Sequence, residues 1–211
     1  KMRMVKALRE HIRRRNPKVS LGIEWFSDVT SQHVDYIHNI TGGAGPGGFQ
    51  EWCRYVFPEI ALSDREIRDD SGDVERLVNH ALLLGMFSDV EIFRCRKTVA
   101  SAPKYAAWLK EANGLRERCG DFLLRGCYRD TLGFTLDHSG ILARAFIARD
   151  GRMAVVATQS ETDEADGVIA VPGCRYESCD GYGGYGVVAT GDQVKVTLKR
   201  HGFVLLVYRQ A

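Results

Sequence analysis

The spacing of apolar residues predicts a helix followed by a strand at the beginning of the chain. Apolar residues recur every three or four positions from Val5 to Ile12, and the positions between them are mostly charged, as on a helix that covers a core. Pro17 ends this helix, because proline disfavours the α conformation in the residue before it. The apolar run 19–23 then has the character of a strand buried on both faces. Helix, turn and buried strand together predict an α/β unit.

The rest of the first 129 residues continues this alternation of predicted elements. A helical pattern runs through 32–40, and the glycine-rich stretch 41–48 can sustain neither helix nor strand. Residues 52–60 are predicted to be extended. Two helices follow, over 73–85 with an aspartate as cap and over 101–126 with a serine as cap.

The pattern changes after about residue 130, where short apolar segments alternate with turn residues. Segments 141–148 and 153–158 flank an Asp-Gly pair, which is the strongest short hairpin signal. Further strands are predicted over 168–171, 186–189, 193–199 and 203–208. Many short strands with close turns predict an antiparallel β-sandwich. The predicted fold class is therefore α/β followed by all-β, with residues 1–129 and 130–211 as the two domains.

Composition excludes several classes of partner. Lys and Arg total 29 against 27 Asp and Glu, a formal charge of +2, so no strong field favours nucleic acid. No apolar run approaches the ~20 residues that span a bilayer, so no membrane association is expected. The six cysteines have no CxxC spacing, and only Cys174 and Cys179 are close enough in sequence to suggest a local bridge, which the sequence leaves open. The compartment of the protein stays open as well.

The order of these elements resembles the C-terminal end of TIM-barrel glycoside hydrolases. In alpha-amylase-like and alpha-galactosidase-like enzymes, a strand pair similar to GDQVKVTLKRHGFVLLVYR ends a small sandwich beside the barrel. The stretches WCRYVFPEIALSDRE and VNHALLLGMF resemble the last barrel units of a poorly characterised bacterial group. The resemblance implies a partial (β/α) barrel followed by a β-sandwich. A full barrel takes about 250 residues, so it also implies a fragment, whose open strand edges the missing barrel portion or another subunit would cover.

Two carboxylates follow the first predicted strand and are the candidate catalytic residues, Glu24 and Asp28. Barrel enzymes place reactive groups at the carboxyl ends of their strands. Hydrolysis of a glycosidic bond needs a proton donor and a second carboxylate as nucleophile or base. Glu24 is the better candidate, because Trp25 beside it could stack on a sugar or exclude water and raise the pKa of the acid. The alternative is that Glu24 pairs with an arginine at the barrel rim.

Five more residues are candidates for contact with the substrate. Asp35 and His38 would share a face of the helix predicted over 32–40. Glu59, Asp64 and Arg65 are charged residues that follow an extended stretch, and structural ion pairing is the alternative role for them.

No metal or cofactor is expected. His33 and His38 are five residues apart, which is not a chelating spacing on a helix. The glycine-rich stretch 41–48 lacks the lysine of a phosphate-binding loop, so it is predicted to be a rim loop of the site or a plain connector.

The sequence thus predicts a fragment of a glycoside hydrolase with a carbohydrate substrate. The alternative is a non-catalytic carbohydrate-binding or assembly module. In that case three tyrosines in the glycine-rich segment of the sandwich, Tyr176, Tyr182 and Tyr185, could stack on sugar rings, although ordinary turns contain tyrosine and glycine as well.

Overall fold

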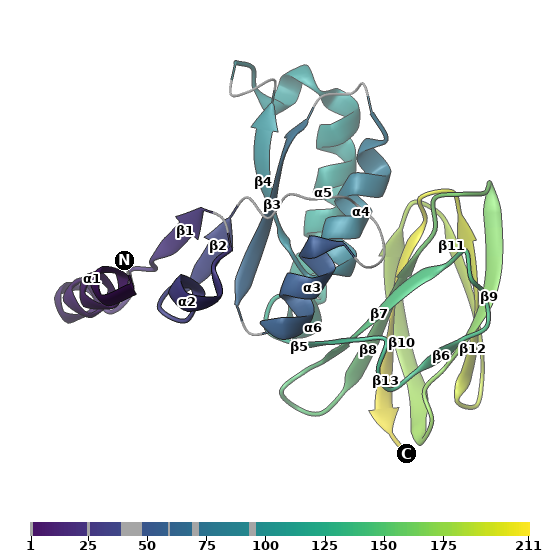
Figure 1. Ribbon diagram of the computed structural model, residues 1–211. Helices are drawn as coiled ribbons and strands as arrows, with labels where there is room; N and C mark the ends of the chain where they lie inside the picture. Colours follow the sequence, from purple (N-terminus) through teal and green to yellow (C-terminus); the bar gives the residue numbers. More distant parts are fainter. Residues whose placement is uncertain (1, 25, 39–47, 59, 69–71, 93–95) are drawn as a thin grey trace.

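The protein is layered, with helices between a parallel sheet and a pair of antiparallel sheets (Figure 1). The computed structural model describes residues 2–24, 26–38, 48–58, 60–68, 72–92 and 96–211.

The parallel sheet has four strands in the order in which they occur along the chain. They are β1 (Gly22–Glu24), β2 (Tyr36–His38), β3 (Ala61–Arg68) and β4 (Phe87–Ile92). Each strand pairs in parallel with the next. Parallel neighbours need a crossover connection, and a helix lies within every one of the three connections. The first part of the chain is therefore a series of consecutive βα units.

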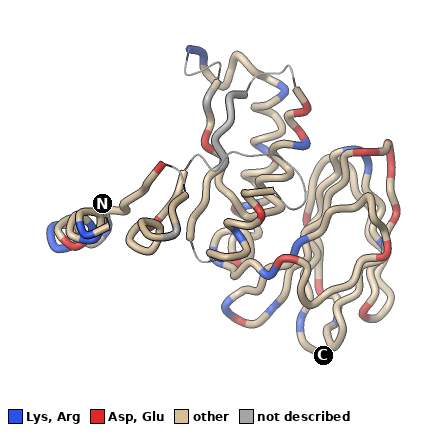
Figure 2. The backbone as a smooth tube through the Cα atoms, viewed as in Figure 1, with Lys and Arg blue, Asp and Glu red and all other residues tan. Residues whose placement is uncertain are grey.

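The helices are α1 (Met2–Arg15), α2 (Asp28–Ser31), α3 (Phe49–Val56), α4 (Val74–Leu83), α5 (Pro103–Arg118) and α6 (Gly120–Leu123), with a 3₁₀ turn, η1 (Val99–Ser101). Asp73 caps α4 as predicted, because its carboxylate accepts the N–H of Arg76 at 3.1 Å. Gly85, with φ of 63°, then turns the chain away in a left-handed conformation. In contrast, α1 has no buried residue and carries dense charge (Figure 2).

The rest of the chain forms two antiparallel sheets. Their strands are β5 (Cys127–Asp130), β6 (Thr135–Leu136), β7 (Leu142–Ile147), β8 (Met153–Thr158), β9 (Glu164–Ala170), β10 (Cys174–Tyr182), β11 (Tyr185–Thr190), β12 (Gln193–Lys199) and β13 (Phe203–Gln210). One sheet has the order β10-β13-β8-β7-β5 and the other β11-β12-β9-β6. The hairpin predicted at Asp-Gly is confirmed, with Gly151 at φ of 86° between β7 and β8.

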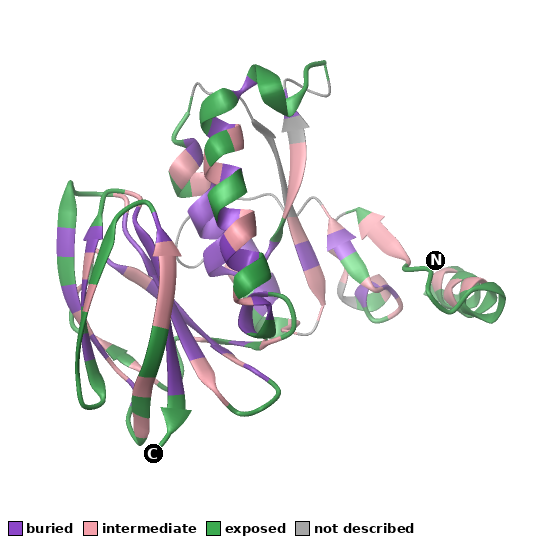
Figure 3. Cartoon of the chain, turned by 180° about the vertical axis from the view of Figure 1, so that it is seen from behind, coloured by how far each residue is buried: buried purple, intermediate pink, exposed green. Residues whose placement is uncertain are grey.

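Two cores hold these layers together. One lies between the two antiparallel sheets, where alternate residues of β12, such as Val194 and Val196, meet Leu206 of β13. The other core lies between the helices and the opposite face of the five-stranded sheet that contains β13. Leu82 of α4 shares this core with Phe203 of β13. Figure 3 shows these buried positions concentrated where the layers face each other, and none on α1. The helical part is thus fixed directly to the antiparallel part.

Two predicted elements are wrong, and both errors come from short segments. The helix predicted over 32–40 is instead the strand β2, in which only Ile37 is buried, between the more exposed Tyr36 and His38. The stretch 52–60, predicted to be extended, contains most of α3, which begins at Phe49 and ends before Pro58. Proline at that place stops a helix as readily as a strand. The stretch 41–47 lies outside the described residues.

The antiparallel part contains three strands that the sequence did not predict, β5, β6 and β10. The glycine-rich segment with the tyrosines forms β10, and it pairs with β13 over its length. Tyr182 is buried there, so it does not offer a ring to a ligand, whereas Tyr185 is 38% exposed. Cys174 and Cys179 are free thiols.

Candidate functional site

One face of the parallel sheet collects polar residues at the carboxyl ends of its strands. Glu24 of β1 pairs in register with His38 of β2. Paired residues of a sheet point to the same side, and every second residue of a strand does so. His38 therefore follows Tyr36 on this face, while Ile37 between them points into the core. We call the face that carries Glu24, His38 and Asp89 the inner face.

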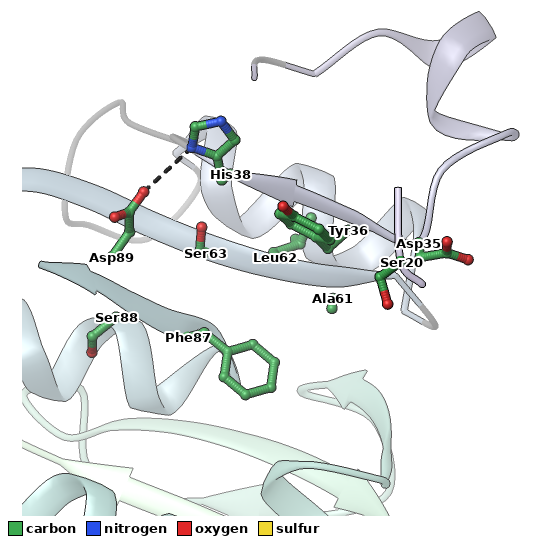
Figure 4. Close-up of a pocket in the computed structure, with 10 residues that line it drawn as sticks. All are labelled: Ser20, Asp35, Tyr36, His38, Ala61, Leu62, Ser63, Phe87, Ser88 and Asp89. Carbon is green, nitrogen blue, oxygen red and sulfur yellow. Dashed lines mark hydrogen bonds and ion pairs between the residues drawn. The ribbon is translucent and has the colours of Figure 1, made fainter. Parts of the chain in front are cut away.

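A cavity of about 720 Å³ lies over the inner face of β2, β3 and β4. The described residues that line it are drawn in Figure 4: Ser20, Asp35, Tyr36, His38, Ala61, Leu62, Ser63, Phe87, Ser88 and Asp89. Its volume is in the range of sites for small molecules. Polar groups and aromatic rings both border it, so the cavity offers hydrogen bonds as well as apolar contact to a ligand.

His38 and Asp89 form a pair across the sheet. Nδ1 of His38 lies 3.3 Å from Oδ2 of Asp89, although β3 separates their strands. Ser63 of β3 stands between them, and its small side chain lets the two longer ones meet above it. About a third of each side chain is exposed, 32% and 34%, so both remain accessible from the cavity. Asp89 could not be singled out in advance, because strand β4 was not predicted from the sequence.

Asp35 lines the cavity and also contacts α1. Its carboxylate accepts hydrogen bonds from Arg9 at 3.2 Å, Arg13 at 2.5 Å and the N–H of Leu21 at 2.9 Å. Burial opposes its negative charge, but the Leu21 N–H and the two guanidinium groups outweigh burial and hold the pKa of Asp35 below its usual value. Asp35 therefore ties α1 to the start of β2. Asp35 and His38 both line the cavity. They do not share a helix face as predicted, because His38 lies in a strand.

Glu24 ends β1 inside the parallel sheet, at the position expected for a catalytic carboxylate. Its side chain is exposed, and it is not among the residues that line the cavity. Phe26, two residues later, packs against Trp52 and Phe57 with ring centroids 5.4 Å and 5.1 Å away. An aromatic cluster therefore borders the end of β1.

The other candidate residues are only partly visible. Trp25 and Glu59 lie outside the described residues. Asp28 begins α2, directly after the end of β1, and Asp64 and Arg65 lie in β3. The structure places the backbones of these three residues, and their side chains are not described.

One group of possible metal ligands occurs among the described residues, and none of its three members is in the described lining of the cavity. Asp73, Glu75 and His201 bring their ligand atoms within 4.8 Å of one another. The protein already engages both carboxylates, because Asp73 accepts the N–H of Arg76 and Glu75 lies 3.0 Å from the Lys104 ammonium. None of the described helices has the length and apolar character needed to cross a membrane.

Comparison with known proteins identifies the fold but no family by sequence. No family model and no curated protein matches the chain. Among solved structures, the alpha-amylase from H. orenii is similar over 99% of this chain and 57% of its own, with a TM-score of 0.60 and 11% identity. The catalytic domain of the glycoside hydrolase family 30 xylanase C from Talaromyces cellulolyticus is similar over 98% and 56%, with a TM-score of 0.58 and 12% identity.

A third similar structure is a family 27 β-L-arabinopyranosidase from Geobacillus stearothermophilus, with a TM-score of 0.55 and 8% identity. It is similar over 100% of this chain and 54% of its own length. The chain thus spans a little more than half of each of these proteins, and its fold is similar to that part of their structures.

Proposed function

We propose that the chain is the C-terminal portion of a glycoside hydrolase, with part of a (β/α) barrel in residues 1–129 and a β-sandwich in residues 130–211. Four consecutive parallel βα units followed by antiparallel sheets support this division. The similar structures, all of them about twice as long in their matched chains, support it as well. In this arrangement the inner face of the sheet is the lining of the barrel, because the helices cover the other face.

The exposed rings on the inner face support an incomplete barrel. Tyr36 is 41% exposed and Phe87 is 40% exposed, although both belong to strands of the sheet. In a closed barrel, layers of side chains from all strands fill the interior. The missing barrel portion, or another subunit, would cover these rings and deepen the cavity into a substrate cleft.

The observation that carries the function is the placement of Glu24, His38 and Asp89 on one face of the sheet. Glu24 serves as the acid/base or nucleophile in cleavage of a glycosidic bond, with the aromatic cluster around Phe26 limiting water on one side. The His38–Asp89 pair holds sugar hydroxyls, because it offers a donor and an acceptor side by side. Asp89 and Asp28 are the candidates within this chain for the second carboxylate. Asp35, Glu59, Asp64, Arg65 and Trp25 remain proposed substrate contacts.

The test is turnover of a panel of aryl glycosides by the product of the complete reading frame and by the chain itself. Glu24→Gln should lower kcat by about 10²–10⁴-fold, which is the usual contribution of a general acid or base. Glu111→Gln, an exposed carboxylate on α5, is the matched control and should leave turnover unchanged. Equal turnover by wild type and Glu24→Gln removes Glu24 from the mechanism.

A non-catalytic carbohydrate-binding module is the second candidate, and exposed Tyr185 on β11 favours it. It predicts that Tyr185→Ala weakens glycan binding and that no variant or wild type cleaves any glycoside. Turnover that depends on Glu24 would contradict it.

A further inference from the structure

A second cavity, of about 510 Å³, lies at the opposite ends of the parallel strands from His38. The residues just before β3 and β4 border it, together with the α6–β5 connection and the turn between β7 and β8. None of its described lining residues is acidic, whereas three of them are arginines, Arg54, Arg125 and Arg149. The described part of the lining is therefore positively charged, and it lies between the helical and the antiparallel parts.

Arg54 is a buried cation that has only neutral partners among the described residues. It is 6% exposed, its Nη1 donates to the carbonyl of Ile60 at 2.9 Å, and its guanidinium lies 5.7 Å from the centroid of the Tyr128 ring. Its Nε is buried without a hydrogen-bond partner. Burial lowers the pKa of Arg54, but an arginine stays charged in proteins. A buried charge is costly unless an opposite charge pairs with it.

The two other arginines are exposed at the border of the cavity. Arg125 donates to Asp121 at 2.6 Å, and Asp121 is exposed and does not line the cavity. Arg149 lies in the turn between β7 and β8. Gly85 helps to keep the cavity open, because a Cβ there would lie 2.9 Å from the Phe146 ring and 3.5 Å from Nη2 of Arg54.

We propose that this cavity binds the phosphate group of a small molecule. Guanidinium forks match phosphate oxygens in bidentate geometry, and three of them balance a dianion better than they balance a single carboxylate. The volume admits a ligand larger than phosphate alone, such as a phosphorylated sugar. This cavity lies at the other end of the strands from Glu24. Phosphate binding can therefore be tested independently of the proposed hydrolysis.

The experiment measures binding of inorganic phosphate to the whole chain by calorimetry and by the shift of Tm, at constant ionic strength set with chloride. Phosphate should bind and raise Tm, because a ligand of the native state stabilises it. Arg149→Gln and Arg125→Gln should each weaken binding about tenfold or more, since each removes a charge-assisted hydrogen bond. Arg175→Gln is the matched control, because this exposed arginine lies on β10 at the other edge of the sheet. It should bind phosphate like wild type.

Three arms identify the ligand group and separate this site from the catalytic one. Hexose 6-phosphate should bind at least as tightly as phosphate, and acetate at equal concentration should compete poorly. Glu24→Gln should bind phosphate normally whatever its effect on glycosides. The proposal is overturned if chloride alone reproduces the Tm shift, if acetate competes as well as phosphate, or if both rim variants bind like Arg175→Gln. The variants of the two exposed arginines, Arg125→Gln and Arg149→Gln, test the proposal even if an Arg54 variant does not fold.

Discussion

Replacing Asn79 by alanine should lower the stability of the protein, because this side chain joins the helical part to the antiparallel part. Asn79, on α4, is 1% exposed and makes four hydrogen bonds. Its Oδ1 accepts from the indole N–H of Trp108 at 2.9 Å and the hydroxyl of Tyr182 at 2.7 Å. Its Nδ2 donates to Oγ1 of Thr158 at 3.0 Å and to the carbonyl of His201 at 2.8 Å. One amide thus connects two helices to three segments of the antiparallel part.

The size of the effect follows from the groups that alanine would leave without a partner. The Trp108 and Tyr182 donors and the His201 carbonyl would lose the side chain to which they bond. A buried polar group without a partner costs about 1–3 kcal/mol, and neighbouring losses are not additive. The free energy of unfolding should therefore fall by roughly 3–5 kcal/mol in Asn79→Ala. At about 2–4 °C per kcal/mol for a chain of this size, Tm should fall by about 10 °C.

Urea unfolding, followed by tryptophan fluorescence and circular dichroism, measures this change, and Trp108 reports on the network itself. Lys110→Ala is the control, because Lys110 is an exposed position of α5 and should change stability by less than about 0.5 kcal/mol. A loss below about 1 kcal/mol in Asn79→Ala would refute the reasoning. It would mean that water or a rearrangement satisfies the orphaned groups.

Two further predictions concern ionisable groups with a shifted pKa, His80 and Asp35. Burial, with the charge of Arg76, lowers the pKa of His80 to about 4, so the unfolded chain, with a histidine pKa of about 6.5, binds the proton first as pH falls. The free energy of unfolding should fall by up to about 3 kcal/mol between pH 6.5 and pH 4. Urea unfolding should show a smaller fall over this range in His80→Gln than in wild type. Equal falls in the two proteins would contradict this prediction. The lowered pKa of Asp35 means that its pairing with α1 stabilises the protein at neutral pH and is lost as pH falls through that pKa. Trypsin should cut α1 faster in Asp35→Asn than in wild type at pH 7.5. Asp192→Asn, at an exposed position, is the control and should be cut like wild type. Equal rates in wild type and both variants would show that Asp35 does not hold α1 in place.

Elements with strong local signals were predictable from the sequence. The Asp-Gly turn predicted the hairpin of β7 and β8, and Asp73 and Gly85 marked the two ends of α4. In each case the residues that determine the conformation are adjacent to the element. Strands β12 and β13 were predictable for the same reason, since one buried face alternates with a wetter one in β12.

The parallel strands were harder to predict, because their conformation depends on distant neighbours. β2 has three residues, and it is a strand because β1 and β3 flank it. In β3 the charged residues Asp64, Arg65 and Glu66 stand in succession, which hides a two-residue period. In β4 charged and apolar residues alternate over only four positions, 89–92. Asp89, one of the three residues that define the inner face, was missed for this reason. Glu24 follows an apolar run and could be found, whereas Asp89 meets His38 only through pairing across β3.

The described linings of the two cavities differ in charge, and the connections between strands explain why. The carboxyl ends of the strands hold Glu24 and Asp89, while the connections at the amino ends hold Arg54 and Arg125. In a βα series, connections of one kind gather at each end, so residues far apart in sequence accumulate into two separate sites. Ala61 and Phe87 border both cavities, and among the described residues the two linings share no others. A larger side chain at Ala61 is therefore the change most apt to disturb both sites together, whereas substitutions at Glu24 or Arg149 should each affect one.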